Sequence, residues 1–342
     1  MRALVVHSER RFRAFVDAFA RVGVEAEELD LSDPEWLTKD YKSFDVVVFY
    51  PQFRFTSSSP HALWEVKDCF RHLVSRCGPD TVFYPDPNLI DFYNDKYKQF
   101  LFLKSSGLPI PDTIALTSPE SLDIAIETFG FPLVLKSRYG AGGDTVSIVT
   151  SNEQALAQFD ASRMNFTNPR AAMAVAKQLF SREFWYYALK VRQMRYPLPS
   201  WPLIAQRFYD IRRDLKTVVG DGRVVEAHWR RPANKAMWKM NIDAGAVGEW
   251  SFVPPEPIEV SEKLAALLQA NWLNTDLLET SQGFLIGEFS PVWHHYKYRE
   301  HPKFVYADDY NLPLSAEAAA NLEELIVESL TKQASANTAP DG

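Results

Sequence analysis

Short apolar runs alternate with amphipathic stretches over the first quarter of the chain, and this alternation predicts strands followed by helices. The first helical stretch carries apolar side chains three to four positions apart and ends at Gly23, a residue suited to a helix C-terminus. Strands that alternate with helices are typical of a parallel sheet. We therefore expect residues 1–91 to form an N-terminal Rossmann-like α/β module. Its expected strands are 3–7, 45–51 and 81–85, and its expected helices are 10–23 and 61–78.

Beyond residue 91 the pattern changes to helices mixed with strand pairs, which predicts an α+β arrangement. Two apolar runs within 131–150 lie on either side of a glycine-rich link, and this arrangement favours a hairpin. The aromatic and basic stretch 163–201 fits neither the helical nor the strand period. The other expected elements are helices at 94–107, 152–160, 261–273 and 316–333, strands at 204–210, 215–222 and 223–231, and a last strand pair around a turn at 281–283.

These elements predict a two-lobed unit at 92–332. We place the first lobe at about 92–200 and the second at about 201–332. Residues 333–342 are mostly small and polar and cannot bury enough surface to order themselves, so we expect a mobile tail there. The fold class is therefore α/β, with an N-terminal module followed by two α+β lobes.

Composition narrows the classes of function. The 342 residues include 37 basic and 44 acidic side chains, a formal charge of −7 that disfavours nucleic acid as a partner. The only two cysteines suggest neither a disulfide framework nor a zinc site. Charged residues interrupt the N-terminal apolar run too early for a secretory signal, and no later run is long enough for a membrane span. We expect a cytoplasmic protein that does not bind membranes.

The glycine-rich link is the first candidate for chemistry. Gly140, Gly142 and Gly143 allow backbone N–H groups to approach an anion closely. Lys136 precedes them at the end of an apolar strand, where a phosphate would satisfy its ammonium group. A Walker loop has its lysine after the glycines, so this loop is better interpreted as a flap over phosphates. An ordinary glycine hairpin with a lysine that reaches water is the alternative.

Two carboxylates form the second candidate. Asp276 and Glu288 are twelve positions apart on either side of a turn, so they could face each other in a hairpin. Glu288 interrupts an apolar strand, where an isolated carboxylate is costly unless a cation meets it. Mg²⁺ favours carboxylate oxygens and commonly bridges nucleotide phosphates. A salt bridge with a basic neighbour such as Lys239 is the alternative.

A basic cluster within an acidic protein is the third candidate. Arg230, Arg231, Lys235 and Lys239 lie in the segment 230–246 and would suit an anionic ligand. A solvated charged face is the alternative interpretation.

Taken in this order, these pieces resemble the ATP-grasp superfamily, and within it the glutathione synthetase and ribosomal-protein glutamate ligase branch. The resemblance covers about residues 88–291. It implies a pre-ATP-grasp module followed by two α+β lobes that bind ATP and Mg²⁺, or Mn²⁺ in its place. The nucleotide residues that it implies are Lys96, Lys136, Gly140, Gly142, Gly143, Gln206, Arg207, Phe208, Asp214, Lys239 and Asn241.

The resemblance also implies roles for single residues. Lys96 and Lys136 would touch phosphate, Gln206 and the backbone of Arg207 and Phe208 would bind adenine, and Asp214 would bind ribose. Lys136 and Arg230 would be catalytic, with Arg230 near the acyl phosphate. Asp276, Glu288 and Ser290 would ligate the metal. The sequence departs from the family at three places: the hinge is about two residues shorter and lacks its glycine, Lys216 stands where arginine is common, and Ser290 stands where asparagine is usual.

The activity that the resemblance implies is amide-bond formation. A carboxylate of a small molecule or peptide would be phosphorylated by ATP, and an amine would attack the acyl-phosphate with release of ADP and phosphate. The alternatives are a small-molecule kinase of the same fold and a nucleotide-binding protein without turnover. The sequence leaves the oligomeric state open, with a homodimer as one candidate because dimers are the common outcome for soluble enzymes.

Overall fold

We describe a computed structural model of the chain, which places residues 1–8, 12–51, 60–140, 146–163, 173, 202–233, 240, 245–249, 251–292 and 322–337. The chain divides into two compact units. The first comprises Met1–Thr56, His61–Tyr93 and Ile211–Gly342, and the second comprises Ser57–Pro60 and Asn94–Asp210. Within the described ranges, no helix is both long and apolar enough to span a bilayer.

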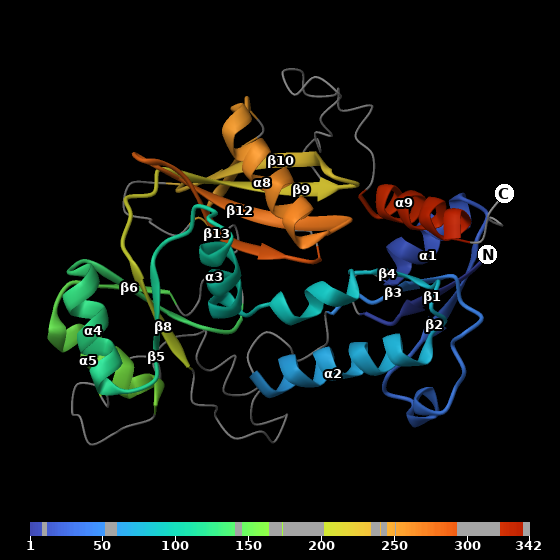
Figure 1. Cartoon of the computed structure of the whole chain (residues 1–342), viewed down its shortest axis with the longest axis horizontal. Coiled ribbons are helices and arrows are strands. Elements are labelled where there is room, and N and C mark those ends of the chain that lie inside the picture. The colour runs from blue at the N-terminus through green and yellow to red at the C-terminus, as the bar shows by residue number, and fades with distance from the viewer. Residues whose placement is uncertain are drawn as a thin grey trace. The chain divides into compact units, whose positions relative to one another are not determined.

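The first unit contains a four-stranded parallel sheet in the order β2-β1-β3-β4. Figure 1 shows helix α2 on one side of this sheet and helices α1 and α9 on the other. Phe70 of α2 contacts both Phe49 and Phe83, so aromatic packing holds this helix on the sheet. The bounds are β1 Arg2–Val6, α1 Phe12–Arg21, β2 Glu25–Leu29, β3 Val46–Val48, α2 Pro60–Arg76 and β4 Val82–Tyr84, with short 3₁₀ helices at η1 Pro34–Leu37 and η2 Pro87–Phe92.

The pattern of the sequence missed strand β2. Its residues EAEEL are mostly exposed because β2 is an edge strand, paired only with β1 in the sheet. A strand without a buried face lacks the apolar signal that marked the other three.

The second sheet of this unit has five strands in the order β11-β10-β9-β12-β13, and every neighbouring pair is antiparallel. Helix α8 packs on one of its faces, where the hydroxyl groups of Thr217 and Ser261 are 2.9 Å apart. The bounds are β9 Arg213–Gly220, β10 Arg223–Arg231, β11 Val247–Glu249, α8 Pro255–Leu268, β12 Trp272–Thr280 and β13 Gly283–Ser290.

Two expected boundaries in this unit were wrong. Helix α8 begins at Pro255 and ends at Leu268, not at 261–273, because Gln269 adopts a left-handed conformation (φ 52°) and Trp272 starts β12. Helix α9, Leu322–Asn337, continues into the expected mobile tail. Ala334 is buried and Asn337 donates from Nδ2 to the carbonyl of Asp80 at 3.1 Å, so tertiary contacts order residues that composition alone would leave mobile.

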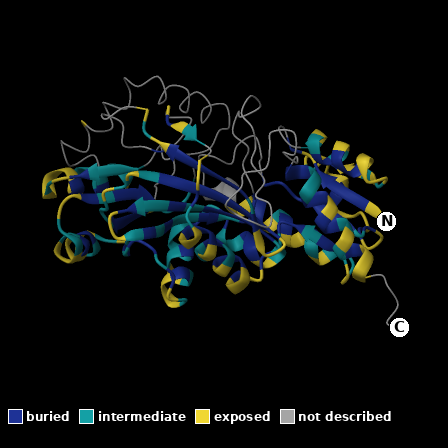
Figure 2. Ribbon diagram, turned by 90° about the horizontal axis from the view of Figure 1, so that it is seen from above, coloured by how far each residue is buried: buried dark blue, intermediate teal, exposed yellow. Residues whose placement is uncertain are grey.

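The second unit contains a four-stranded antiparallel sheet in the order β5-β8-β6-β7, and helices α4 and α5 pack against it. Leu122, Ala125 and Phe159 of these helices pack against Leu133 and Ala205 of the sheet. Figure 2 shows that buried residues lie along the strands and that exposed residues lie on the outward sides of the helices. The bounds are α3 Lys96–Ser105, β5 Thr113–Leu116, α4 Pro119–Phe129, β6 Leu133–Ser137, β7 Ser147–Val149, α5 Asn152–Ser162 and β8 Leu203–Arg207.

Strand β8 changes the expected division between the lobes. Residues 203–207 pair with β5 and β6, so this strand completes the first lobe's sheet. The division of the chain therefore falls after Asp210, not near residue 201. The predicted hairpin across the glycine-rich link is confirmed by the antiparallel pairing of β6 with β7.

Candidate functional site

One face of the five-stranded sheet is lined by polar and charged side chains, and we call this the polar face. Residues directly opposite one another on neighbouring strands share a face. The pairing therefore arranges the polar face in three rows across β10, β9, β12 and β13. The rows are Arg230–Asp214–Leu278–Leu285, His228–Lys216–Asp276–Glu288 and Glu226–Val218–Asn274–Ser290.

Two β-bulges decide which side chains reach the polar face. Gly287 is an extra residue in β13, between Ile286 opposite Leu277 and Glu288 opposite Asp276. Val225 is the corresponding extra residue in β10. Each bulge shifts the alternation of its strand by one residue, and without it the following side chains would point to the opposite face. The bulges thus bring Glu288 and Arg230 to the same face as Asp276.

Four charged side chains form a cluster in the first two rows, three of them buried and the fourth, Asp276, with its side chain 13% exposed. Asp214 accepts two hydrogen bonds from Arg230, from Nε at 2.6 Å and from Nη2 at 2.8 Å. Asp276 accepts from Arg230 Nη2 at 2.8 Å and from Lys216 Nζ at 3.0 Å. In the orientation that satisfies its neighbours, the amide of Asn274 also accepts from Lys216 Nζ at 2.8 Å. The predicted alternative partner of the acids, Lys239, lies outside the described residues.

The cluster perturbs the titration of its members. Burial raises the pKa of Asp214 to about 6, against the opposing attraction of Arg230. Burial alone would also raise the pKa of Asp276, but the positive charges of Arg230 and Lys216 prevail and lower it. Burial would lower the pKa of Arg230, and the charges of Asp214 and Asp276 instead raise it well above its usual value. Asp276 is therefore ionised and surrounded by cations.

The acids fit a divalent cation in their donor chemistry. Asp276 and Glu288 face each other directly, as the spacing predicted, and Ser290 lies in the next row of the same face. Carboxylate and hydroxyl oxygens suit Mg²⁺, which keeps several waters when few protein ligands are present. Among the described residues no three His, Cys, Asp or Glu side chains are placed to hold a metal ion together, so a metal proposal rests on this pair with Ser290.

Asp214, to which the resemblance assigned a ribose-binding role, forms an ion pair with Arg230. Both oxygens of its carboxylate accept hydrogen bonds from Arg230, and the residue is 5% exposed. A carboxylate that accepts two hydrogen bonds from one arginine fixes the orientation of the guanidinium group. This pair was not predicted, because the bulge at Val225 shifts the register of the β9–β10 hairpin and so aligns Arg230 with Asp214.

The second unit brings three of the predicted phosphate elements together. Asp95 caps helix α3 through the Lys98 N–H (3.1 Å) and accepts two hydrogen bonds from Arg138 at 2.8 and 2.7 Å. The next residue, Lys96, donates from Nζ to the carbonyl of Gly140, where the glycine-rich link begins. Lys136 is 9% exposed on β6, two residues before Arg138. Lys96 is thus joined to the first residue of the glycine-rich link.

Two of the groups predicted to bind adenine at the hinge form hydrogen bonds within the protein. Gln206 donates from Nε2 to Thr113 Oγ1 at 2.8 Å, and the N–H of Arg207 donates to the carbonyl of Asp112 at 3.0 Å. The Arg207 N–H is therefore not a donor for adenine in this structure, because the pairing of β8 with β5 extends to it. Phe208 follows directly after the end of β8. Gly142, Gly143, Lys239 and Asn241 lie outside the described residues.

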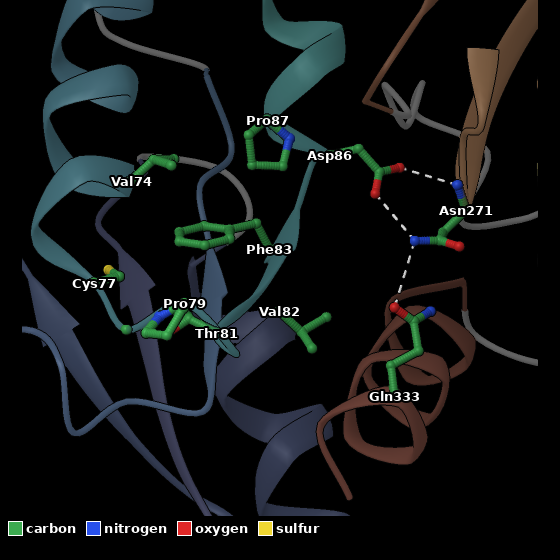
Figure 3. A pocket seen from close by; sticks show the side chains of 11 residues that line it. Val74, Cys77, Pro79, Thr81, Val82, Phe83, Asp86, Pro87, Asn271 and Gln333 are labelled. Atoms are coloured by element: carbon green, nitrogen blue, oxygen red, sulfur yellow. Dashed lines mark hydrogen bonds between the residues drawn. The ribbon is translucent and has the colours of Figure 1, made fainter. Parts of the chain in front are cut away.

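A cavity of about 570 Å³ lies elsewhere in the first unit (Figure 3). Asn271 donates to both oxygens of Asp86, through its backbone N–H at 2.9 Å and its Nδ2 at 3.0 Å. The same Nδ2 lies 3.4 Å from Gln333 Oε1, so these lining groups satisfy one another. These hydrogen bonds connect the segment after β4, the residue before β12 and helix α9 at the edge of the cavity. Because these polar groups are paired with one another, the polar face remains the better candidate site.

Comparisons with known proteins agree with this picture. No family model matches the chain. The sequence is 23% identical over 193 residues to the tetrahydromethanopterin:alpha-L-glutamate ligase of Methanosarcina acetivorans, covering 56% of this chain and 52% of that protein. It is 24% identical over 213 residues to the Glutamate–LysW ligase ArgX of Sulfolobus acidocaldarius, covering 59% of this chain and 62% of that protein. The match thus spans between half and two thirds of each curated relative.

Solved structures match over nearly the whole chain. A RimK domain ATP-grasp protein from Sphaerobacter thermophilus superposes with a TM-score of 0.58 at 14% identity, covering 97% of this chain and 100% of that chain. The D-alanine–D-alanine ligase of Bacillus anthracis superposes with a TM-score of 0.57 at 14% identity, covering 98% and 99%.

The protein therefore has the ATP-grasp fold. Within that class its sequence is similar to the RimK-like glutamate ligases, the branch that the motifs had indicated.

Proposed function

We propose that this chain is an ATP-dependent carboxylate–amine ligase that forms an amide bond through an acyl-phosphate and releases ADP and phosphate. The observation that carries the proposal is the polar face, where two facing acids lie beside a buried arginine and lysine. Similarity to two glutamate ligases and to a D-alanine–D-alanine ligase supports amide formation as the reaction.

In this proposal Asp276, Glu288 and Ser290 hold Mg²⁺, which when bound neutralises charge on the nucleotide phosphates. Within the second unit, the proposal assigns phosphate binding to Lys96, Lys136 and the glycine-rich link. The N-terminal parallel sheet corresponds to a Rossmann-like pre-ATP-grasp module, and the two lobes are divided near residue 210.

The chemistry of the chain's own residues is then chiefly positional and electrostatic. The substrate carboxylate attacks the γ-phosphate of ATP, and fixed positive charge stabilises the negative charge that spreads over the transferred group. The amine next attacks the acyl carbonyl and phosphate leaves. Arg230 is held rigidly by Asp214 and can present a guanidinium N–H to the developing oxyanion without reorganisation.

The experiment is a screen of amino acids and short peptides for ADP formation stimulated by an amine. L-Glutamate is the first probe, because both curated relatives are named as glutamate ligases. The proposal expects ADP and never AMP, with one amide formed for each ADP. A stable phosphoester on the substrate would indicate a kinase instead, and the absence of ADP with every acceptor would indicate a nucleotide-binding protein without turnover.

A further inference from the structure

Glu226 and His228 form a buried polar pair on the polar face that none of the proposed roles uses. They lie two residues apart on β10, and both are 4% exposed. His228 Nδ1 donates to Glu226 Oε1 at 2.7 Å. A carboxylate accepts only, so the imidazole carries its proton on Nδ1 and fixes the orientation of the glutamate.

The second oxygen of Glu226 is unsatisfied within the described chain. Oε2 is buried and accepts no hydrogen bond from any residue that the structure describes. Buried carboxylate oxygens are almost always hydrogen-bonded, because the group loses its water without compensation otherwise. An oxygen left in this state at the edge of a candidate active site indicates a place for a donor that binds from outside.

The neighbouring cations are engaged elsewhere. Lys216, opposite His228, donates to Asp276, and Arg230, two residues farther along β10, donates to Asp214 and Asp276. Directly opposite Glu226 is Val218, which is 1% exposed and contributes an apolar wall. A fixed carboxylate beside an apolar side chain suits a positively charged N–H donor that carries an alkyl carbon.

We propose that Glu226, held by His228, binds the ammonium group of the amine co-substrate. This inference rests on the proposed ligase function and adds a substrate class to it: a primary amine that is cationic at neutral pH, as in a free amino acid. The bulge at Val225 is what places Glu226 on this face, next to the row that contains Asp276 and Glu288.

The test compares two nucleophiles in the same variant. Hydroxylamine is uncharged at neutral pH, whereas the best amino-acid acceptor from the screen carries an ammonium group. The measured quantity is kcat/KM for that amino acid divided by kcat/KM for hydroxylamine, with saturating ATP, Mg²⁺ and the carboxylate that gives the strongest hydroxamate signal in the wild type. We expect Glu226→Gln to lower this ratio by about 10- to 100-fold through a higher KM for the amino acid, because a charge-assisted hydrogen bond is lost.

Two further variants make the result specific. Glu226→Asp keeps the charge, so its ratio should lie between those of Glu226→Gln and the wild type. Glu249→Gln changes an exposed glutamate that pairs with Arg231 on the opposite face of the same sheet, and its ratio should equal that of the wild type. An unchanged ratio in Glu226→Gln, or an equal loss with both nucleophiles, would overturn the inference and leave the ligase proposal standing. A wild type that forms neither hydroxamate nor ADP would overturn the ligase proposal itself.

Discussion

Asp276 and Glu288 face each other across β12 and β13 because Gly287 is an extra residue in the register of the hairpin. The regular part of the hairpin, from Thr280 opposite Gly283 to Leu277 opposite Ile286, would set Asp276 opposite Gly287 and turn Glu288 to the apolar face. A single inserted residue thus creates the carboxylate pair on which the proposed metal site depends.

Deletion of Gly287 should therefore destroy the pair. The shortened strand would place Glu288 on the face covered by α8, and we expect a loss of stability of more than about 3 kcal/mol in urea unfolding because a charge would be buried without a partner. Gly287→Ala is the matched control, since it keeps the register. A Cβ there lies 3.1 Å from Leu278 Cγ, so this substitution should cost only about 1 kcal/mol. Equal stability of the two variants would refute the role of the bulge.

Loss of Arg230 should be more severe than loss of its neighbour. Arg230→Met leaves the carboxylates of Asp214 and Asp276 buried without their shared cation, and we expect a cost of about 3–5 kcal/mol. Arg231→Met removes an exposed ion pair with Glu249 on the opposite face and should change stability by less than about 1 kcal/mol. Urea unfolding of both variants measures the difference, and comparable costs would contradict the cluster described above.

Much of the fold could be predicted from the sequence, because the spacing of apolar residues shows which side chains of a strand or helix are buried. The buried strands β1, β3 and β4 and the hairpins β6–β7, β9–β10 and β12–β13 all carried that signal. The exposed edge strand β2 did not. Helix α9 was predicted too short because its last turn is ordered by the burial of Ala334 and by the hydrogen bond from Asn337 to the carbonyl of Asp80, which composition does not reveal.

The candidate site was predictable only in part, for a different physical reason. Asp276 and Glu288 were found by their spacing around a turn. The pairing of Asp214 with Arg230 depends on the bulge at Val225, which shifts the register of the β9–β10 hairpin. The pairing of Lys216 with Asp276 depends on β9 lying beside β12, which the pattern of a single strand does not show. Glu226 and His228 could have been suspected from the alternation of polar residues ending at Arg230.

Position 220 requires a glycine because the ring of Trp272 approaches its backbone closely, and not because of a positive φ. A Cβ at this position would lie 2.6 Å from the indole of Trp272, whose Nε1 also lies 3.3 Å from Ser329 Oγ of α9. Gly220→Ala should therefore lower stability by about 1–3 kcal/mol, and thermal unfolding should show a fall of several degrees. Adding Trp272→Phe removes the crowded ring atoms. If the double variant is destabilised by the full sum of the two single changes, steric crowding is not the cause.

The thiol of Cys77 should react slowly in the folded protein. Burial, with a smaller contribution from Asp40, raises its pKa from 9.0 to about 11, so the thiolate fraction at pH 8 falls by about 100-fold. We expect alkylation by iodoacetamide at pH 8, followed by mass spectrometry, to be that much slower in native than in urea-unfolded protein. The native rate should keep rising tenfold per pH unit up to about pH 10. A native rate that levels off near pH 9 would contradict the raised pKa.

The central claim is that Asp276 and Glu288 support phosphorylation of a carboxylate by ATP. The most direct measurement is ATP-dependent hydroxamate formation in the presence of hydroxylamine, Mg²⁺ and a panel of amino acids and peptides. The proposal predicts hydroxamate with the wild type and a loss of at least about 100-fold in Glu288→Gln. Glu279→Gln, on the opposite face of the same hairpin where it pairs with Arg213, should retain the wild-type rate. Equal rates in Glu288→Gln and the wild type would contradict the account.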